Sequence, residues 1–255
     1  MSLISCNALN VKIADTNVCE NLTLSIKAGE SWAILGMNGC GKTTLLHTIA
    51  GLLAAQAGEI SLNKSNINNL SRREVAQQIS LLLQHQEDHF PGTVLEAVLI
   101  GRHPHLKSWE WESENDKQLA IDTLSLVGLD NFSQRPILTL SGGERQRVAL
   151  ATLLVQQTKI RLLDEPVNHL DIHHQHEVMK ILTVNNDSTA NVFVLHDVNL
   201  ATRYCDHALL MFGNGETLQG SCDEVLNEMN LSKLYQHPIS EISHQDHRWF
   251  MANSN

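Results

Sequence analysis

The chain has 255 residues, of which 42% are hydrophobic and 18% are charged. This length and composition exclude a peptide-sized module and a largely disordered chain, and they suffice for one large core with a sub-domain. The 28 acidic and 18 basic residues give a net charge of -10, which argues against a nucleic acid or an anionic membrane surface held by bulk charge. A bound phosphate would therefore need a local phosphate-binding motif.

The five cysteines are scattered and form no Cys-x-x-Cys pair, so neither a disulfide framework nor an ordinary structural zinc site is expected. No apolar run approaches the roughly 20 residues of a membrane helix, and the first basic residue, Lys12, comes too late for a signal peptide. These features predict a protein of the reducing cytoplasm.

The first third of the chain contains short strand-like runs. Strands are predicted at residues 3–11, 22–26, 31–35, 59–62 and 79–83. The third of these leads directly into a glycine cluster, which is followed by a predicted helix at residues 42–50. Residues 93–157 then change to helical spacing, so we expect a helical insert there.

Beyond the insert, strands alternate with helices. Strands are predicted at residues 160–163, 192–195 and 208–212, and helices at residues 173–184 and 197–204. This alternation is typical of a parallel sheet, so the predicted fold class is α/β with a helical sub-domain. Arg161 is unusual in a parallel strand, and we expect it near the strand's beginning. After residue 221 we expect two short helices and a polar tail.

The glycine cluster GMNGCGKT at residues 36–43 fits the phosphate-loop pattern G-x-x-x-x-G-K-[ST], and it lies between a predicted strand and a predicted helix. Its backbone N–H groups would surround phosphate oxygens, while Lys42 would reach the β- and γ-phosphates and the Thr43 hydroxyl would bind Mg²⁺. A plain glycine-rich turn is the alternative. Cys40 is interpreted as a small residue that the loop tolerates.

Two further patterns place polar groups at the ends of predicted elements. LSGGERQR, at residues 140–147, precedes an apolar helix and predicts a capping box, but its two glycines also expose N–H groups that could face a second phosphate. Asp164 and Glu165 follow a strand, at the edge where α/β sheets bind ligands. Asp164 suits Mg²⁺ and Glu165 suits a base or orienter for water; a surface acidic pair is the alternative.

These motifs, in this order, make the chain resemble the ATP-binding subunits of ABC transporters over nearly its whole length. The family's motifs correspond to residues 36–44 (phosphate loop), Gln84 (glutamine loop), 140–146 (signature), Asp164 and Glu165 (Mg²⁺ and catalytic carboxylates), 168–171 (D-loop) and His196 (switch histidine). The resemblance implies an α/β P-loop fold of ABC type with a mostly parallel core sheet, an antiparallel β sub-domain and an inserted helical sub-domain. A single domain would span residues 1–255, with its nucleotide-binding core at 1–84 and 160–255 and its helical sub-domain at 85–159.

The resemblance also implies ATP and Mg²⁺ as cofactors and a head-to-tail homodimer that shares each ATP. One copy would hold the phosphates with Asn38, Gly39, Cys40, Gly41, Lys42, Thr43 and Thr44. Its catalytic groups would be Glu165, His196, Gln84 and Lys42, and its Mg²⁺ ligands would be Thr43, Gln84 and Asp164. The other copy would add Ser141, Gly142, Gly143 and Gln146 from the signature.

One departure from the family is Ile13, which stands where an aromatic residue usually stacks on adenine. An aliphatic contact would replace the stacking, so weaker adenine binding is expected. His196 alone would more often be a core histidine, but its place directly after a predicted strand favours a contact with the γ-phosphate. The neighbouring His173, His174 and His176 do not converge on a helix, so a solvated face is favoured over a metal site.

Within the family, the chain is most similar to the ATPases of iron-siderophore, haem and cobalamin importers. GRHPH at residues 101–105 and LDIHHQ at residues 170–175 carry this likeness. It implies that two copies energise import through a separate membrane permease, at the cytoplasmic face of the inner membrane, with an external substrate-binding protein as an indirect partner and no nucleic acid. The permease would dock on the helical sub-domain near residues 85–109, with Phe90 and Trp109 as apolar anchors unless Phe90 belongs to the core.

Two other functions remain open. The chain could be a soluble ABC ATPase that serves as a scaffold in repair, translation or iron-sulfur assembly, although its single nucleotide domain and the GRHPH motif favour transport. It could also bind nucleotide without turnover, which the presence of Glu165 and His196 disfavours. The sequence does not name the transported substrate, because that substrate would contact the permease and not this subunit.

Overall fold

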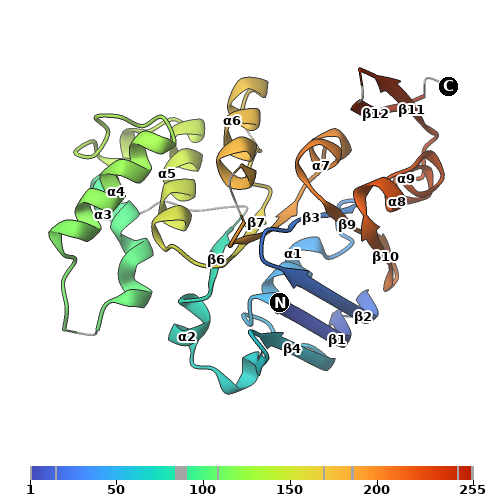
Figure 1. Cartoon of the computed structure of the whole chain (residues 1–255), viewed down its shortest axis with the longest axis horizontal. Coiled ribbons are helices and arrows are strands. Elements are labelled where there is room, and N and C mark those ends of the chain that lie inside the picture. The colour runs from blue at the N-terminus through green and yellow to red at the C-terminus, as the bar shows by residue number, and fades with distance from the viewer. Residues whose placement is uncertain are drawn as a thin grey trace.

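A six-stranded sheet lies at the centre of the computed structural model, in the strand order β10-β9-β3-β8-β7-β6 (Figure 1). The structure describes residues 2–14, 16–83, 91–107, 109–168, 170–184, 187–245 and 247–253. The parallel strands are β9 (His207–Gly213), β3 (Ser31–Gly36), β8 (Ala190–Val194), β7 (Ile160–Asp164) and β6 (Ile79–Leu82), and β10 (Glu216–Ser221) runs antiparallel to β9. β3 and β8 are buried throughout, because both faces of the sheet are covered. The predicted parallel core sheet is confirmed.

A second, antiparallel sheet contains the first two strands of the chain. Its order is β2 (Thr16–Lys27), β1 (Ser2–Ile13), β4 (Ala57–Leu62) and β5 (Ser65–Asn66). Helix α1 (Lys42–Ile49) contacts strands of both sheets and therefore lies between them. In the second half of β2, buried and exposed residues alternate, which is expected for a strand with one face on the core. This sheet is the predicted antiparallel β sub-domain.

The helical insert lies at one end of the molecule (Figure 1). Its elements are α3 (Val94–Leu99), the 3-10 turn η2 (Ile100–His105), α4 (Glu114–Leu126), η3 (Ile137–Thr139) and α5 (Gly142–Val155). The three α-helices each begin with a capping box, whose Ser or Thr residues are Thr93, Ser113 and Ser141. η1 (Ile67–Asn69) and α2 (Arg72–Ala76) lead from the antiparallel sheet to β6. The predicted boundary after residue 84 lies outside the described residues.

The last quarter of the chain differs from the predicted pattern in its tail. Helices α6 (Ile172–Thr183), α7 (Val198–Tyr204), α8 (Cys222–Val225) and α9 (Glu228–Tyr235) follow the prediction closely. The expected polar tail is wrong, because β11 (Ile239–His244) and β12 (His247–Ala252) form an antiparallel hairpin. Phe250 is buried in the main core cluster, and this burial gives the hairpin one packed face. Arg161 is the second residue of β7 and is half-buried, in line with its expected place.

All five cysteines are buried as free thiols. Burial raises the pKa of Cys6 to about 12, of Cys19 to about 11 and of Cys222 to about 12. The pKa values of Cys40 and Cys205 are also raised by burial. None of the helices in the described part of the chain is long and apolar enough to cross a bilayer.

The GRHPH segment ties the elements of the helical insert to one another. The Arg102 guanidinium donates to Asp116 at 2.8 Å and to the Val155 carbonyl at 3.1 Å, so it joins η2 to α4 and to the end of α5. His105 Nε2 lies 2.8 Å from the carbonyl oxygen of Gln156. At Gly101 the backbones approach so closely that an added Cβ would lie 2.2 Å from the Thr152 carbonyl oxygen.

We predict that Gly101→Ala destabilises the fold, because the methyl group would overlap the backbone of α5. Overpacking of this kind costs about 2 kcal/mol, which lowers the melting temperature by roughly 4–8 °C in a chain of this size. Thermal unfolding measures the change. Gly142→Ala is the matched control, since a Cβ at that position meets no heavy atom within 4 Å. Equal melting temperatures for the two variants would contradict the predicted overlap.

Candidate functional site

The loop between β3 and α1 forms the floor of the site. Gly39 and Gly41 have φ angles of 80° and 98°, in the left-handed region that glycine favours. A Cβ on Gly41 would also lie 2.7 Å from both methyl groups of Val18, so the loop packs tightly on β2. α1 begins without a side-chain cap, which leaves its first-turn N–H groups facing the loop. The loop therefore presents backbone donors in a fixed arrangement suited to an anion.

Lys42 lies inside this loop and is almost fully buried, with 6% of its surface exposed. Its ammonium group donates to the carbonyl oxygens of Gly36 at 2.8 Å and of Met37 at 3.1 Å. Cys40 packs its sulfur so near Gly36 that a Cβ there would lie 2.7 Å from it, and burial raises the pKa of its thiol. Within the part of the chain that the structure describes, carbonyl oxygens are the only hydrogen-bond partners of this buried ammonium group, so it is well placed to bind an anion.

Asp164 faces the same edge of the sheet and is completely buried. Neither of its carboxylate oxygens has a hydrogen-bond partner among the described residues. The Thr43 hydroxyl approaches the carboxylate without meeting the geometry of a full hydrogen bond. Burial raises the pKa of Asp164, and Thr43 together with the charges of His47 and Lys42 opposes that increase. Such an unpartnered carboxylate next to a hydroxyl fits a hard divalent cation such as Mg²⁺.

Glu165 and His196 form a direct pair at the end of β7 and β8. His196 Nε2 lies 2.6 Å from Glu165 Oε1, and the Asn168 amide donates to Glu165 Oε2. The backbone of Glu165 has a φ of 53°, an uncommon value for a non-glycine residue, and its N–H donates to the Val194 carbonyl at 3.2 Å. His196 keeps 41% of its side chain exposed, so it is not a core histidine. Glu165 is therefore buried with a partner on each carboxylate oxygen, while His196 remains partly exposed.

The signature residues lie at the start of α5. Ser141 accepts the Glu144 N–H at 3.3 Å, and Glu144 accepts the Ser141 N–H at 2.7 Å, so the predicted capping box is present. Ser141 and Gly142 are exposed, and within the described residues no hydrogen bond links either one to the phosphate loop. The side-chain amide of Gln146 donates to the Pro166 carbonyl at 3.0 Å. This bond joins α5 to the residue after Glu165.

The structure thus brings together Lys42, Thr43, Asp164, Glu165 and His196, and leaves the signature apart from them. Ile13 lies at the end of β1 with half of its surface exposed. Gln84, Phe90 and His169 lie outside the described residues. Sequence reasoning did not find the contact of Asn168 with Glu165 or that of Gln146 with Pro166; the position of Asn168 three residues after Glu165 was the available signal.

Residues 19–168 match the family model described as "ABC transporter". The chain belongs to this family. Its curated relatives include the petrobactin import ATP-binding protein FpuD of Bacillus anthracis, which is 38% identical over 86% of this chain and 81% of FpuD. The achromobactin transport ATP-binding protein CbrD of Dickeya dadantii is 36% identical over 89% of this chain and 86% of CbrD. The protein is therefore an ABC ATPase coupled to transport.

A solved structure supports the same fold. An inward-facing transporter ascribed to the metal-chelate type superposes with a TM-score of 0.87 and 25% identity, covering 100% of this chain and 98% of the other. The ABC-type fold, with its parallel core sheet, antiparallel sheet and helical insert, is confirmed. ATP-binding subunits of this family work in complexes with membrane permease subunits.

We predict that Asp164→Asn stabilises the ligand-free ABC ATPase at neutral pH. An unpartnered buried group costs about 1–3 kcal/mol, and each kcal/mol corresponds to roughly 2–4 °C in melting temperature. The pKa of Asp164 is higher in the folded protein than in the unfolded chain. Protonation of Asp164 therefore stabilises the fold at pH values below the unfolded-state pKa, and this stabilisation is lost as the pH rises through the folded-state pKa. The gain from the substitution should therefore be larger at pH 7 than at about pH 4.

Thermal unfolding in the presence of a chelator, at both pH values, measures this difference. Asp122→Asn, on the exposed surface of α4, controls for the chemical change itself. A gain that is the same at both pH values would mean that the charge of Asp164 does not destabilise the ligand-free site.

Proposed function

We propose that this ABC ATPase energises import of an iron chelate through a membrane permease. The observation that carries the proposal is the likeness, over most of the chain, to ATP-binding proteins named for petrobactin import and achromobactin transport. The GRHPH segment, which joins η2 to α4 and α5, gives this likeness a structural basis in the helical insert. The protein would act at the cytoplasmic face of the inner membrane, with an external substrate-binding protein as an indirect partner.

The site geometry supports ATP hydrolysis by a division of roles among the residues. Lys42, now held by two carbonyl groups, would give its charge to the β- and γ-phosphates, and the loop from Asn38 to Thr44 would supply N–H donors. Asp164 and Thr43 would hold Mg²⁺, with Gln84 as a further ligand, and bound Mg²⁺ would neutralise phosphate charge. Glu165 would orient or deprotonate the attacking water.

His196 would keep Glu165 in place and contact the γ-phosphate. Their 2.6 Å contact fixes the direction of the carboxylate, while the exposed part of the imidazole remains accessible to a ligand. The Asn168 amide restrains the second oxygen of Glu165. With both oxygens restrained, the carboxylate would not need to reorganise when it orients or activates the attacking water.

A second copy would complete the site. Ser141, Gly142 and Gly143 start a helix whose first residues, Ser141 and Gly142, are exposed, and within the described residues neither is hydrogen-bonded to the phosphate loop of its own chain. A helix N-terminus favours negative charge, so this end of α5 suits the γ-phosphate held by another copy. Gln146 would lie in the same interface. Hydrolysis would then require closure of a head-to-tail homodimer.

The permease would dock where the helical insert meets the core. A cavity of about 450 Å³ is lined there by α2, by β6 and by Leu52 and Gln156. The Gln156 amide donates to the carbonyl groups of Ala76 and Ile79, so the floor of the cavity is connected to the end of α5. Trp109 lines a neighbouring cavity and is 77% exposed. An apolar helix of the permease fits such a groove.

Transport is tested by uptake of a radiolabelled ferric siderophore in cells that lack the gene. The unaltered gene should restore uptake. The gene for Leu52→Asp should not restore it, because a carboxylate in the groove would weaken the binding of an apolar permease helix. Leu52→Asp should keep the ATP hydrolysis of the isolated subunit but lose copurification with the permease. Val184→Asp is the control, since Val184 is similarly exposed but does not line the cavity.

Two outcomes would contradict the proposal in different ways. Restored uptake of haem or cobalamin, with no uptake of the siderophore, would overturn the substrate class. If no membrane protein copurifies and no uptake depends on the gene, a soluble scaffold ATPase becomes the better description.

We predict that Glu165→Gln keeps ATP affinity but lowers turnover by about 100-fold or more, because the amide cannot accept a proton. ATP should then hold two copies together, which light scattering detects as a doubling of mass. Lys42→Ala should instead weaken ATP binding itself. A Glu165→Gln variant that stays monomeric with saturating Mg-ATP would contradict the shared site.

We also predict that Ile13→Tyr tightens ATP binding by on the order of 1 kcal/mol, or roughly fivefold in Kd, because an aromatic ring adds stacking on adenine. Calorimetry with ATP measures the gain. Inorganic triphosphate, which lacks the base, should show no improvement. An unchanged Kd for ATP would place the adenine away from Ile13.

A further inference from the structure

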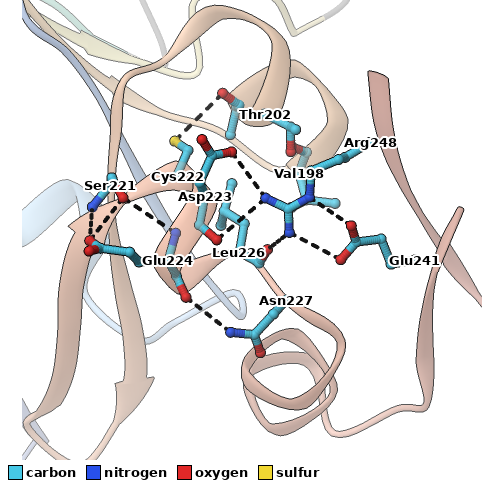
Figure 2. A network of polar contacts seen from close by, with 11 residues as sticks. Val198, Thr202, Ser221, Cys222, Asp223, Glu224, Leu226, Asn227, Glu241 and Arg248 are labelled. Carbon is cyan, nitrogen blue, oxygen red and sulfur yellow. Dashed lines mark hydrogen bonds and ion pairs between the residues drawn. The ribbon is translucent and has the colours of Figure 1, made fainter. Parts of the chain in front are cut away.

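Arg248 joins the C-terminal hairpin to α8, in addition to the contacts that the hairpin makes with α7 and α9. Arg248, on β12, donates to both carboxylate oxygens of Glu241 on β11, at 2.7 Å and 3.0 Å. The same guanidinium donates to Asp223 at 3.2 Å and to the carbonyl of Leu226 (Figure 2). The hairpin is therefore joined through a single side chain to α8 and to the turn that follows it.

Close to Arg248, the hairpin also packs against α7. Phe250 is buried with apolar residues of α7, α8 and α9 in one cluster. The Asn199 side chain binds the backbone of Phe250 twice: its oxygen accepts the Phe250 N–H at 2.8 Å, and its amide donates to the Phe250 carbonyl at 3.2 Å. Asn199 thus pairs with β12 much as a neighbouring strand would.

Asn199 is also linked to the loop that carries His196. Its backbone N–H donates to Asp197 Oδ1 at 2.7 Å, and Asp197 is the N-cap of α7. On the other side of His196, the Leu195 N–H donates to the Ile34 carbonyl at 3.2 Å. The residue before His196 is therefore bound to the central sheet. The residues after His196 are held by the hydrogen bond between Asn199 and Asp197.

The length of α7 makes these anchors necessary. The helix has seven residues, which is too short to be stable without packing partners. Its start, where Asp197 and Asn199 lie, is therefore set by the elements that pack on it. β12 is one of these elements and the one bound by the Asn199 side chain.

We propose that Asn199 is a positioning residue for His196, and that the C-terminal hairpin, held by Arg248, fixes Asn199. Through Asn199, the hairpin thereby influences the position of His196 and its contact with Glu165. This inference rests on the roles proposed above for Glu165 and His196. It extends the machinery of hydrolysis to residues near the end of the chain.

The full-length protein tests this with Asn199→Ala, which removes both hydrogen bonds to Phe250. The kcat for ATP hydrolysis should fall about tenfold, while the KM for ATP changes less than about twofold. This loss is smaller than the roughly hundredfold fall in rate that a misplacement of about 1 Å can cause. The imidazole resonance of His196, assigned with His196→Ala, should shift in long-range nitrogen–proton spectra. Asn199→Asp, which can still accept the Phe250 N–H, should recover part of kcat.

Arg248→Ala provides an independent arm, because it removes the bonds between the hairpin and α8 without altering a residue of α7. It should lower kcat to a similar extent and increase hydrogen exchange at the Phe250 amide, and adding Asn199→Ala should cause little further loss. Lys233→Ala is the control, since it breaks an exposed ion pair with Glu216 that does not involve the hairpin. All variants are assayed well below their melting temperatures.

The outcomes separate this inference from the proposed function. If His196→Ala keeps the unaltered kcat, the role of His196 itself is wrong. If His196→Ala loses activity but Asn199→Ala leaves both kcat and the His196 resonance unchanged, the positioning role is overturned. A fall in kcat with an unmoved His196 resonance would also overturn it, because the loss would then act through another group.

Discussion

The burial of opposite charges at one edge of the central sheet is the constraint on which the site depends. Lys42 and Asp164 are both removed from water, yet neither is satisfied by an ion pair in the described structure; carbonyl oxygens hold the first and no hydrogen bond holds the second. Burial disfavours the charged form of Asp164. This arrangement of two buried charges is therefore unfavourable, and a bound nucleotide with the proposed Mg²⁺ would relieve it.

A second consequence is that the residues of the proposed shared site come from two parts of the fold. The phosphate loop, Asp164 and the Glu165–His196 pair lie on the central sheet, whereas Ser141 lies at the start of a helix in the insert. The Gln146–Pro166 bond and the bonds of Gln156 with Ala76 and Ile79 connect the two parts at separate places. The 14-residue helix α5 runs between Ser141 and Gln156, and it therefore joins the signature to the groove proposed for the permease.

Much of the fold and site follows from the sequence, because the signals are local. The phosphate loop has a fixed spacing, the buried strands are continuous apolar runs, and Ser141 with Glu144 forms a capping box within four residues. The hairpin at the end of the chain was missed because its stability is not local: Phe250 is buried against α7 and α8, and Arg248 finds its partners through tertiary packing. The contact of Gln146 with Pro166 likewise joins residues whose proximity only the fold creates.

The burial of all five thiols has a practical consequence for measuring motion. Alkylating reagents attack the thiolate, and burial both shields these sulfur atoms and raises their pKa values. A cysteine introduced at an exposed position would therefore react with a spin label or fluorophore well ahead of the native ones. Distances between two copies can then be followed through the ATP cycle in a chain that keeps its natural cysteines.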